Sequence, residues 1–179
     1  LGDDTPYYQG RLTLNPLPHI DWVGFFMLMF FHFGWAKPVQ VNPYKFKNIS
    51  VKKGMMLVSL AGPMMNILLA CVGMIALRWL NFDPRMGIYS GSMPELIQML
   101  VPLVQINIIL AVFNLIPVPP LDGSKILAGL LPDAGAQKIY NLEPYGPLLL
   151  LLLIFTDLAG KIIWPLYSIV FAFIYAGVF

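Results

Sequence analysis

Asn114-Leu115-Ile116-Pro117-Val118-Pro119-Pro120-Leu121-Asp122-Gly123 places one carboxylate at the end of a long uncharged run, Leu96–Leu121. An aspartate at membrane depth costs about 2.5–3.5 kcal/mol on insertion scales, so Asp122 is a candidate functional residue. The three prolines lack an N–H donor and interrupt a helix. Broken backbone at that depth occurs only where protein or a wet cavity covers it. The stretch therefore predicts a buried polar site in a membrane protein.

The composition also indicates a membrane protein. The 179 residues are 58% hydrophobic and 11% charged, with a mean hydropathy of +0.73. Soluble domains carry roughly 25% charged residues. The lysines do not belong to a recognisable nucleic-acid-binding module, so we expect no nucleic-acid partner. The length predicts one membrane-embedded domain over residues 1–179.

Four apolar segments are candidate membrane helices. Gly54–Leu77 and Leu96–Leu121 carry no formal charge and are long enough to cross a bilayer. The apolar C-terminal part predicts two helices, Tyr145–Leu158 and Ile162–Phe179. One helix kinked at Pro165 is the alternative.

A polar connection lies between Leu96–Leu121 and Tyr145–Leu158. Gly123–Leu131 predicts a short helix closed by Pro132. Asp157 and Lys161 are four residues apart, a spacing that permits an ion pair at a helical bend or hairpin tip.

The N-terminal part predicts two smaller elements. Arg11–Leu14 alternates polar and apolar residues as a strand does, and Asn15-Pro16 ends it. Trp22–Ala36 is apolar, but as a helix it would reach only about 22 Å. The hydrocarbon core is about 30 Å thick. A re-entrant or interfacial helix fits this segment better than a full span.

The charges predict the orientation. Residues 37–53 hold five lysines and no acid, so the positive-inside rule places this loop in the cytoplasm, beside lipid headgroups. A solvated loop on either side is the alternative. Residues 78–95 carry balanced charges, which suits the outer side. The next span then returns Asp122 towards the cytoplasm.

Several motifs resemble the compact bacterial and archaeal branch of the site-2 protease family, which are intramembrane zinc metalloproteases. The resemblance covers residue 1 to about residue 147. It implies a multi-pass protein of a prokaryotic plasma membrane. The motifs are Leu1–Pro6 followed by Gly10–Asp21, then Phe33–Val39, Ala61–Asn66 and Asn114–Gly123.

The resemblance implies that Asp122 is the third zinc ligand. In the family, a His-Glu-x-x-His motif on the preceding helix supplies two ligands and the catalytic glutamate. This chain has only His19 and His32, and neither stands in that motif. A catalytic zinc needs about three protein ligands. We therefore expect no catalytic residue in this chain, which we interpret as an enzyme truncated at its N-terminus. Either histidine as a substitute ligand is the alternative.

The family mechanism, with that helix restored, is coherent. Zinc lowers the pKa of its bound water to near 7, and the glutamate takes the proton. The substrate is a transmembrane protein segment, locally unwound, to which the Arg11–Asn15 strand could pair as an added edge. The candidate substrate contacts are Asn66, Asn114, Pro117 and Pro119.

Structural roles for the same residues stay open. Asp122 could cap a helix or form a turn. Asn66 and Asn114 could form interhelical hydrogen bonds, and Gly62-Pro63 could allow close helix packing.

The sequence thus predicts an all-α polytopic membrane protein. It has about four transmembrane or re-entrant helices plus a short re-entrant β element near the N-terminus. The predicted function is an intramembrane zinc metalloprotease. A non-catalytic homologue that binds transmembrane helices is the alternative. A transporter half would show inverted repeats, which are not visible. The sequence indicates neither the substrate, the regulation nor the oligomeric state.

Overall fold

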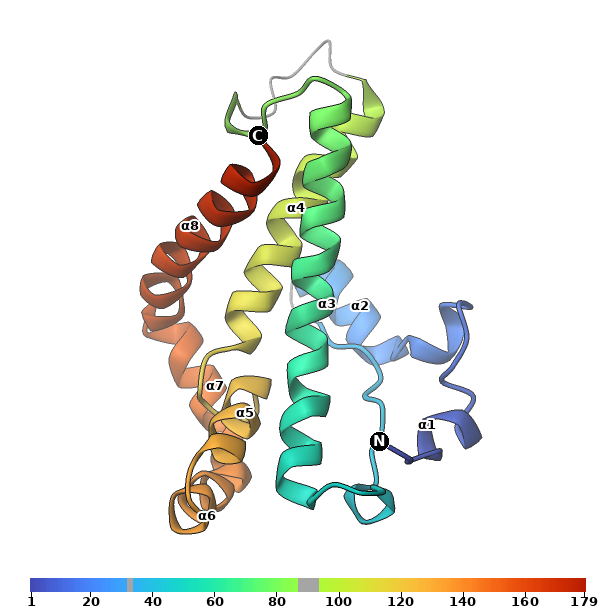
Figure 1. The fold of residues 1–179 in the computed structure, drawn as a ribbon, viewed down its shortest axis with the longest axis vertical. Coiled ribbons are helices and arrows are strands. Elements are labelled where there is room, and N and C mark those ends of the chain that lie inside the picture. The colour runs from blue at the N-terminus through green and yellow to red at the C-terminus, as the bar shows by residue number, and fades with distance from the viewer. Residues whose placement is uncertain (32–33, 87–93) are drawn as a thin grey trace. The chain divides into compact units, whose positions relative to one another are not determined.

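Helices make up the regular secondary structure of the described residues, 1–31, 34–86 and 94–179 of this computed structural model (Figure 1). The chain divides into two units, residues 1–54 and 55–179. The α-helices are α1 (Thr5–Tyr8), α2 (Trp22–Phe31), α3 (Val51–Trp79), α4 (Glu95–Asn114), α5 (Asp122–Leu130), α6 (Asp133–Leu142), α7 (Gly146–Phe155) and α8 (Leu158–Val178). The 3₁₀ turns are η1 (Leu17–His19), η2 (Pro43–Lys45), η3 (Pro84–Met86) and η4 (Glu143–Tyr145).

Three helices, α3, α4 and α8, are long and apolar enough to cross a membrane. The predicted span Gly54–Leu77 is confirmed within α3. The predicted span Leu96–Leu121 is confirmed as α4 only up to Asn114, where the helix gives way to the proline-rich segment.

The core of the second unit forms where these three helices pack together. Gly73 of α3 allows a close approach to α4, because a Cβ there would lie 2.8 Å from Cγ2 of Val104. Aromatic rings of α8 stack along one side of this core, with centroids 5.8 Å apart for Tyr167 and Phe171. The buried core residues are Ala70, Met74, Leu77, Phe82, Ile97, Val101, Val104, Ile108, Val112 and Ile174.

The apolar C-terminal part forms two helices, as predicted. They separate at Asp157, whose backbone is left-handed with φ of 56°. The expected ion pair between Asp157 and Lys161 is absent from the contacts of these two described residues. Asp157 instead folds its carboxylate over the first turn of α8, where a Cβ at Gly160 would lie 2.9 Å from Oδ1.

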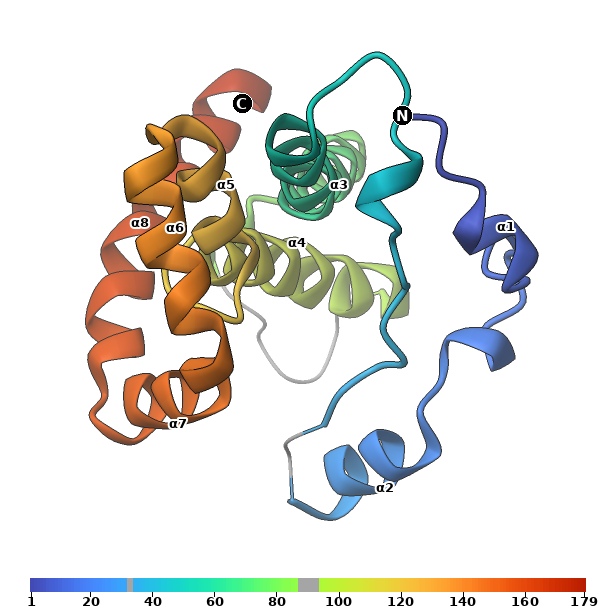
Figure 2. The same cartoon turned by 90° about the horizontal axis from the view of Figure 1, so that it is seen from below.

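Two short helices fill the predicted polar connection. The expected helix Gly123–Leu131 is confirmed as α5, and Pro132 separates it from α6. Figure 2 shows α5 and α6 side by side, in the same region as α7. Gly129 brings α5 against α3, because a Cβ there would lie 2.5 Å from Cβ of Met56.

The predicted β element at Arg11–Leu14 is wrong. Residues 12–14 form a bend, and no strand occurs in the described part of the chain. Local hydrogen bonds compete with a strand here: the Asn15 amide donates to Oγ1 of Thr13, and the Leu17 amide donates to Oδ1 of Asn15. The Arg11 side chain is also buried, whereas a half-buried strand would turn its polar side chains to solvent.

Among the described residues of the apolar segment Trp22–Ala36, Trp22–Phe31 form helix α2. The ten-residue helix α2 is too short to cross a membrane, which agrees with the predicted length limit. From Gly34 the chain returns without helical structure, and the Lys37 amide donates to the His19 carbonyl at 3.1 Å.

Candidate active site around Asp122

Asp122 follows a short irregular segment that turns the chain between α4 and α5. Three backbone hydrogen bonds hold the turn: Ile116 to the Phe113 carbonyl, Val118 to the Ile116 carbonyl and Leu121 to the Val118 carbonyl, at 2.8–3.1 Å. The prolines need no acceptor for a backbone N–H, so they suit a segment with few hydrogen-bond partners. The predicted break in the backbone is confirmed.

Apolar side chains anchor this turn to the C-terminal helices. Ile116, Leu121 and Leu153 of α7 form a buried cluster, and Ile162 of α8 packs against it. The anchor is apolar, so it fixes the position of Asp122 without using the carboxylate.

Gly123 sets the angle at which α5 begins. A Cβ at this position would lie 2.5 Å from the Ile116 carbonyl oxygen and would also overlap the Leu115 carbonyl oxygen. The contacts are with backbone, which cannot move aside as a side chain can. Only glycine therefore allows the first turn of α5 to sit on the end of α4. Ser124, which is 1% exposed, adds a hydrogen bond from its hydroxyl to the Leu121 carbonyl at 2.7 Å.

The carboxylate of Asp122 faces helix α3. A Cβ at Gly62 would lie 3.6 Å from Oδ2 of Asp122, and the neighbouring Pro63 is fully buried. Asp122 is half-buried. Among the described residues, none donates a hydrogen bond to its carboxylate or pairs with it. A half-buried carboxylate with no protein partner is suited to binding a cation.

The other predicted site residues differ in their placement. Asn114 donates from Nδ2 to the Leu110 carbonyl at 2.9 Å, which leaves its oxygen available as an acceptor. Asn66 is half-buried on α3, four residues after Gly62 and thus on the same helix face. Pro117 is exposed.

Pro119 has a structural role. It is buried, and the Pro119-Pro120 pair packs on the start of α7, where a Cβ at Gly146 would lie 3.2 Å from the Pro120 nitrogen. Because Gly146 has no side chain, the segment can approach α7 this closely.

The described residues do not form a complete metal site. They contain no group of three His, Cys, Asp or Glu side chains that could hold a metal ion. The ring of His19 is bonded from Nε2 to the Thr13 carbonyl at 3.0 Å, and His32 lies outside the described residues. Asp122 fits the chemistry of a zinc ligand, but zinc needs about three protein ligands. The described part of the chain does not complete the coordination.

Sequence reasoning missed the direct relation between Gly62 and Asp122. A glycine inside a long apolar helix was a signal, because it costs about 1 kcal/mol relative to alanine and needs a reason. We interpreted it as a helix-packing residue. Sequence reasoning also missed the burial of Arg11, for which alternating polar and apolar residues gave no signal.

Comparison with known proteins identifies the family. Residues 84–154 match Peptidase family M50. The chain is 38% identical over 165 residues to a Bacillus subtilis (strain 168) protein named "Putative zinc metalloprotease YwhC", and this match covers 92% of the chain and 74% of the relative. The chain matches no solved structure. With three helices long and apolar enough to cross a membrane, and Asp122 unpaired by any described residue at the helix break, this chain belongs to the site-2 proteases, peptidase family M50.

Proposed function

We propose that this protein is an intramembrane zinc metalloprotease in which Asp122 is a zinc ligand and whose substrates are transmembrane segments of other proteins. The observation that carries the proposal is the Asp122 carboxylate, which is half-buried at a break in an apolar helix and has no partner among the described residues. A charge at such depth persists when function requires it. Membership of the family supports zinc as the metal.

The remaining ligands and the catalytic glutamate belong, in this proposal, to residues outside the described ranges. Asp122 supplies one negative charge and one or two oxygen ligands. The zinc, when bound, supplies the Lewis acid for peptide hydrolysis. This chain contributes the position of Asp122, which the Gly123 contact and the Ile116–Leu121 anchor fix before any metal binds.

Two amides are candidates for holding the substrate backbone. A transmembrane substrate exposes N–H and C=O groups when it unwinds, and these need partners inside the bilayer. The free oxygen of Asn114 accepts a substrate N–H in this proposal, and the Asn66 amide serves as a second contact. Pro117, which is exposed, offers an apolar surface beside them. Pro119 is buried against α7 and supports the turn instead.

The lysine-rich segment 37–53 supports an orientation with this loop in the cytoplasm. We place the protein in a prokaryotic plasma membrane because it resembles the bacterial and archaeal branch of the family and a Bacillus subtilis relative. Because α3 begins within the segment, its other end at Trp79 lies outside in this proposal.

The test is metal retention and cleavage by the purified full-length protein. Asp122→Asn keeps the shape of the side chain and removes its charge, so bound zinc and proteolysis of a transmembrane substrate should both be lost while helicity is kept. Glu143→Gln, which removes an exposed carboxylate in η4, is the matched control and should retain both.

An Asp122→Asn protein with the zinc content of the unchanged protein would contradict the ligand role. If the unchanged protein instead purifies without zinc and binds a transmembrane peptide without cutting it, the non-catalytic alternative holds.

A further inference from the structure

Within the first unit, the two ends of the segment from His19 to Lys37 lie side by side. The backbone hydrogen bond from the Lys37 amide to the His19 carbonyl, 3.1 Å long, closes its base. Its two arms touch through glycines: a Cβ at Gly24 would overlap the backbone of Trp35, and a Cβ at Gly34 would overlap the Gly24 carbonyl. We call the segment 19–37 the apolar hairpin.

The helical arm of this hairpin presents large apolar side chains outward. Helix α2 has ten residues, about 15 Å, half the thickness of the hydrocarbon core. An apolar helix of this length suits a re-entrant or interfacial segment rather than a full span. The base of the hairpin then lies at the level of the lipid headgroups. The exposed residues of α2 are Trp22, Val23, Phe25, Phe26, Leu28, Met29, Phe30 and Phe31.

Arg11 lies at this base with an incomplete set of hydrogen bonds. Its side chain is only 7% exposed. Nη1 donates to the Pro18 carbonyl and Nη2 to the Lys37 carbonyl, so the guanidinium bridges the two ends of the hairpin. Its buried Nε has no partner among the described residues. A buried donor without an acceptor is unfavourable, and it indicates where an acceptor from outside the chain can bind.

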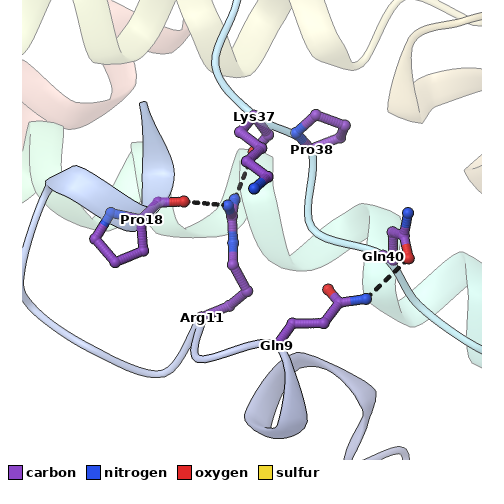
Figure 3. A pocket seen from close by; sticks show the side chains of 6 residues that line it. All are labelled: Gln9, Arg11, Pro18, Lys37, Pro38 and Gln40. Atoms are coloured by element: carbon purple, nitrogen blue, oxygen red, sulfur yellow. Dashed lines mark hydrogen bonds between the residues drawn. The ribbon is translucent and has the colours of Figure 1, made fainter. Parts of the chain in front are cut away.

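A cavity of about 370 Å³ adjoins Arg11 (Figure 3). Gln9 donates from Nε2 to Oε1 of Gln40 at 2.8 Å, which orders the opposite wall and leaves the Gln40 amide nitrogen free to donate. The lining of this cavity contains two cationic side chains, two amide side chains and no carboxylate. The lining residues are Gln9, Arg11, Pro18, Lys37, Pro38 and Gln40.

This unit has three acids among its described residues: Asp4 is exposed and lies outside the cavity lining, and Asp3 and Asp21 accept hydrogen bonds elsewhere. The hydroxyl of Thr5 donates a hydrogen bond to Asp3 and is the largest cause of the lowered pKa of its carboxyl. The backbone amides of Asn42 and Thr5 also donate to this carboxylate and lower its pKa further. Asp21 accepts from the Gly24 amide at 3.0 Å. None of these three carboxylates lines the cavity, so the lining carries a positive charge that no described acid neutralises.

We propose that the Arg11 cavity binds the phosphate of an anionic phospholipid headgroup. The Nε–H of Arg11, the ammonium of Lys37 and the free amide of Gln40 supply donors for phosphate oxygens, which pair well with guanidinium groups. The location selects a lipid over a free anion, because the acyl chains of a lipid held at the hairpin base contact the exposed face of α2. Basic groups at this level attract anionic lipids. The bound lipid fixes the depth of the apolar hairpin.

The side-chain signal of Arg11 reports the binding directly. The sequence contains three arginines, Arg11, Arg78 and Arg85, so a protein labelled with ¹⁵N-arginine gives few Nε–H signals. The signal that is lost in Arg11→Lys is the signal of Arg11, whatever other arginines the full-length protein contains. Titration of the full-length protein in zwitterionic micelles with dihexanoyl-phosphatidylglycerol should shift the Arg11 signal saturably. Inorganic phosphate at the same concentration should leave it unchanged.

Substitutions at the cavity wall test the site while preserving the bridge that Arg11 makes to backbone carbonyls. Lys37→Gln should weaken binding of the lipid about fivefold, the effect of one basic group near a membrane. Gln40→Leu should also weaken it. Lys53→Gln removes the same charge outside the cavity and should bind as the unchanged protein does.

Three outcomes overturn the proposal. An unshifted Arg11 signal excludes an anion at Nε. An equal response to inorganic phosphate makes this a site for a free anion. Equal loss of affinity in Lys37→Gln and Lys53→Gln makes the attraction a property of the whole basic surface.

Discussion

Gly62 in the middle of α3 faces the carboxylate of Asp122 at the start of α5. A Cβ at Gly62 would lie 3.6 Å from Oδ2 of Asp122, which is ordinary van der Waals contact. Glycine inside a helix costs about 1 kcal/mol relative to alanine. The absent side chain leaves open space beside a carboxylate to which no described residue donates. The relation joins the Ala61–Asn66 and Asn114–Gly123 motifs into one site.

Side chains of increasing size at position 62 should separate folding from metal binding. Gly62→Ala fits the available space and should keep the fold, with a free energy of unfolding that is unchanged or higher by up to about 1 kcal/mol. Gly62→Leu should extend over the carboxylate and lower both zinc content and proteolysis. Circular dichroism, elemental analysis and cleavage of a transmembrane substrate measure the three properties.

The control places the same bulk on another face of α3. Ala61 is exposed and lies about 100° around the helix from Gly62, so Ala61→Leu should retain zinc and activity. A Gly62→Leu protein with full zinc content would show that this face of α3 does not border the metal site.

Gly123 should tolerate no side chain. In Gly123→Ala the new methyl group meets the carbonyl oxygens of Leu115 and Ile116, the second at 2.5 Å, so the backbone must shift. We expect a loss of about 1–3 kcal/mol in unfolding free energy, the usual cost of overpacking. The shift should also displace Asp122 and reduce bound zinc. Gly177→Ala, which has open space around its Cβ, should leave the stability unchanged or higher. Equal stability of Gly123→Ala and the unchanged protein would contradict the contact.

The sequence was sufficient to predict the long apolar helices and the break before Asp122. Uncharged runs and prolines act locally, so α3, α4, the proline-rich turn and the two C-terminal helices followed from them. The same local reasoning failed at Arg11–Leu14. Alternation of polar and apolar residues indicates a strand only when the polar side chains face water. The Arg11 side chain instead points inward to two carbonyls that lie in other parts of the unit.

The site could be predicted only in part for a related reason. Asp122 was found because a charge in an apolar run is conspicuous in one sequence. The role of Gly62 depends on which residue of another helix faces it, and spacing along the chain does not contain that information. Asp157 and Lys161 show the converse: their spacing permitted an ion pair, but Asp157 has a left-handed backbone and precedes the first residue of α8, the helix that contains Lys161.

Cysteine labelling should establish the orientation of α3. In a Cys71→Ser background, Tyr44→Cys places a thiol at a position that is 91% exposed in the lysine-rich segment. A membrane-impermeant maleimide should label it in inside-out vesicles and leave it unlabelled in intact cells. Leu80→Cys, just beyond the other end of α3, should show the opposite pattern. Labelling of Tyr44→Cys from outside would reverse the proposed orientation.

The contact of Asp83 with α8 should make the stability of the fold depend on pH. Its carboxylate accepts from Nη2 of Arg85 at 2.6 Å and from the Tyr175 hydroxyl at 3.2 Å. The Arg85 side chain, followed by the Arg85 backbone amide, lowers the pKa of Asp83 from 3.8 to about 2. Because the folded pKa lies below the unfolded value, this group stabilises the fold above about pH 4. The contribution should be lost as the pH falls towards 2.

Asp83→Asn makes this contribution measurable. The variant lacks the charged partner at every pH, so its Tm should be below that of the unchanged protein at pH 6, and the difference should shrink as the pH falls from 4 to 2. The difference should also shrink in high salt, because the pair is exposed to solvent. Tyr175→Phe removes one hydrogen bond and keeps the ion pair, so it should lower Tm less than Asp83→Asn does. A Tm difference that stays constant from pH 6 to pH 2 would mean that Asp83 acts through its shape rather than its charge.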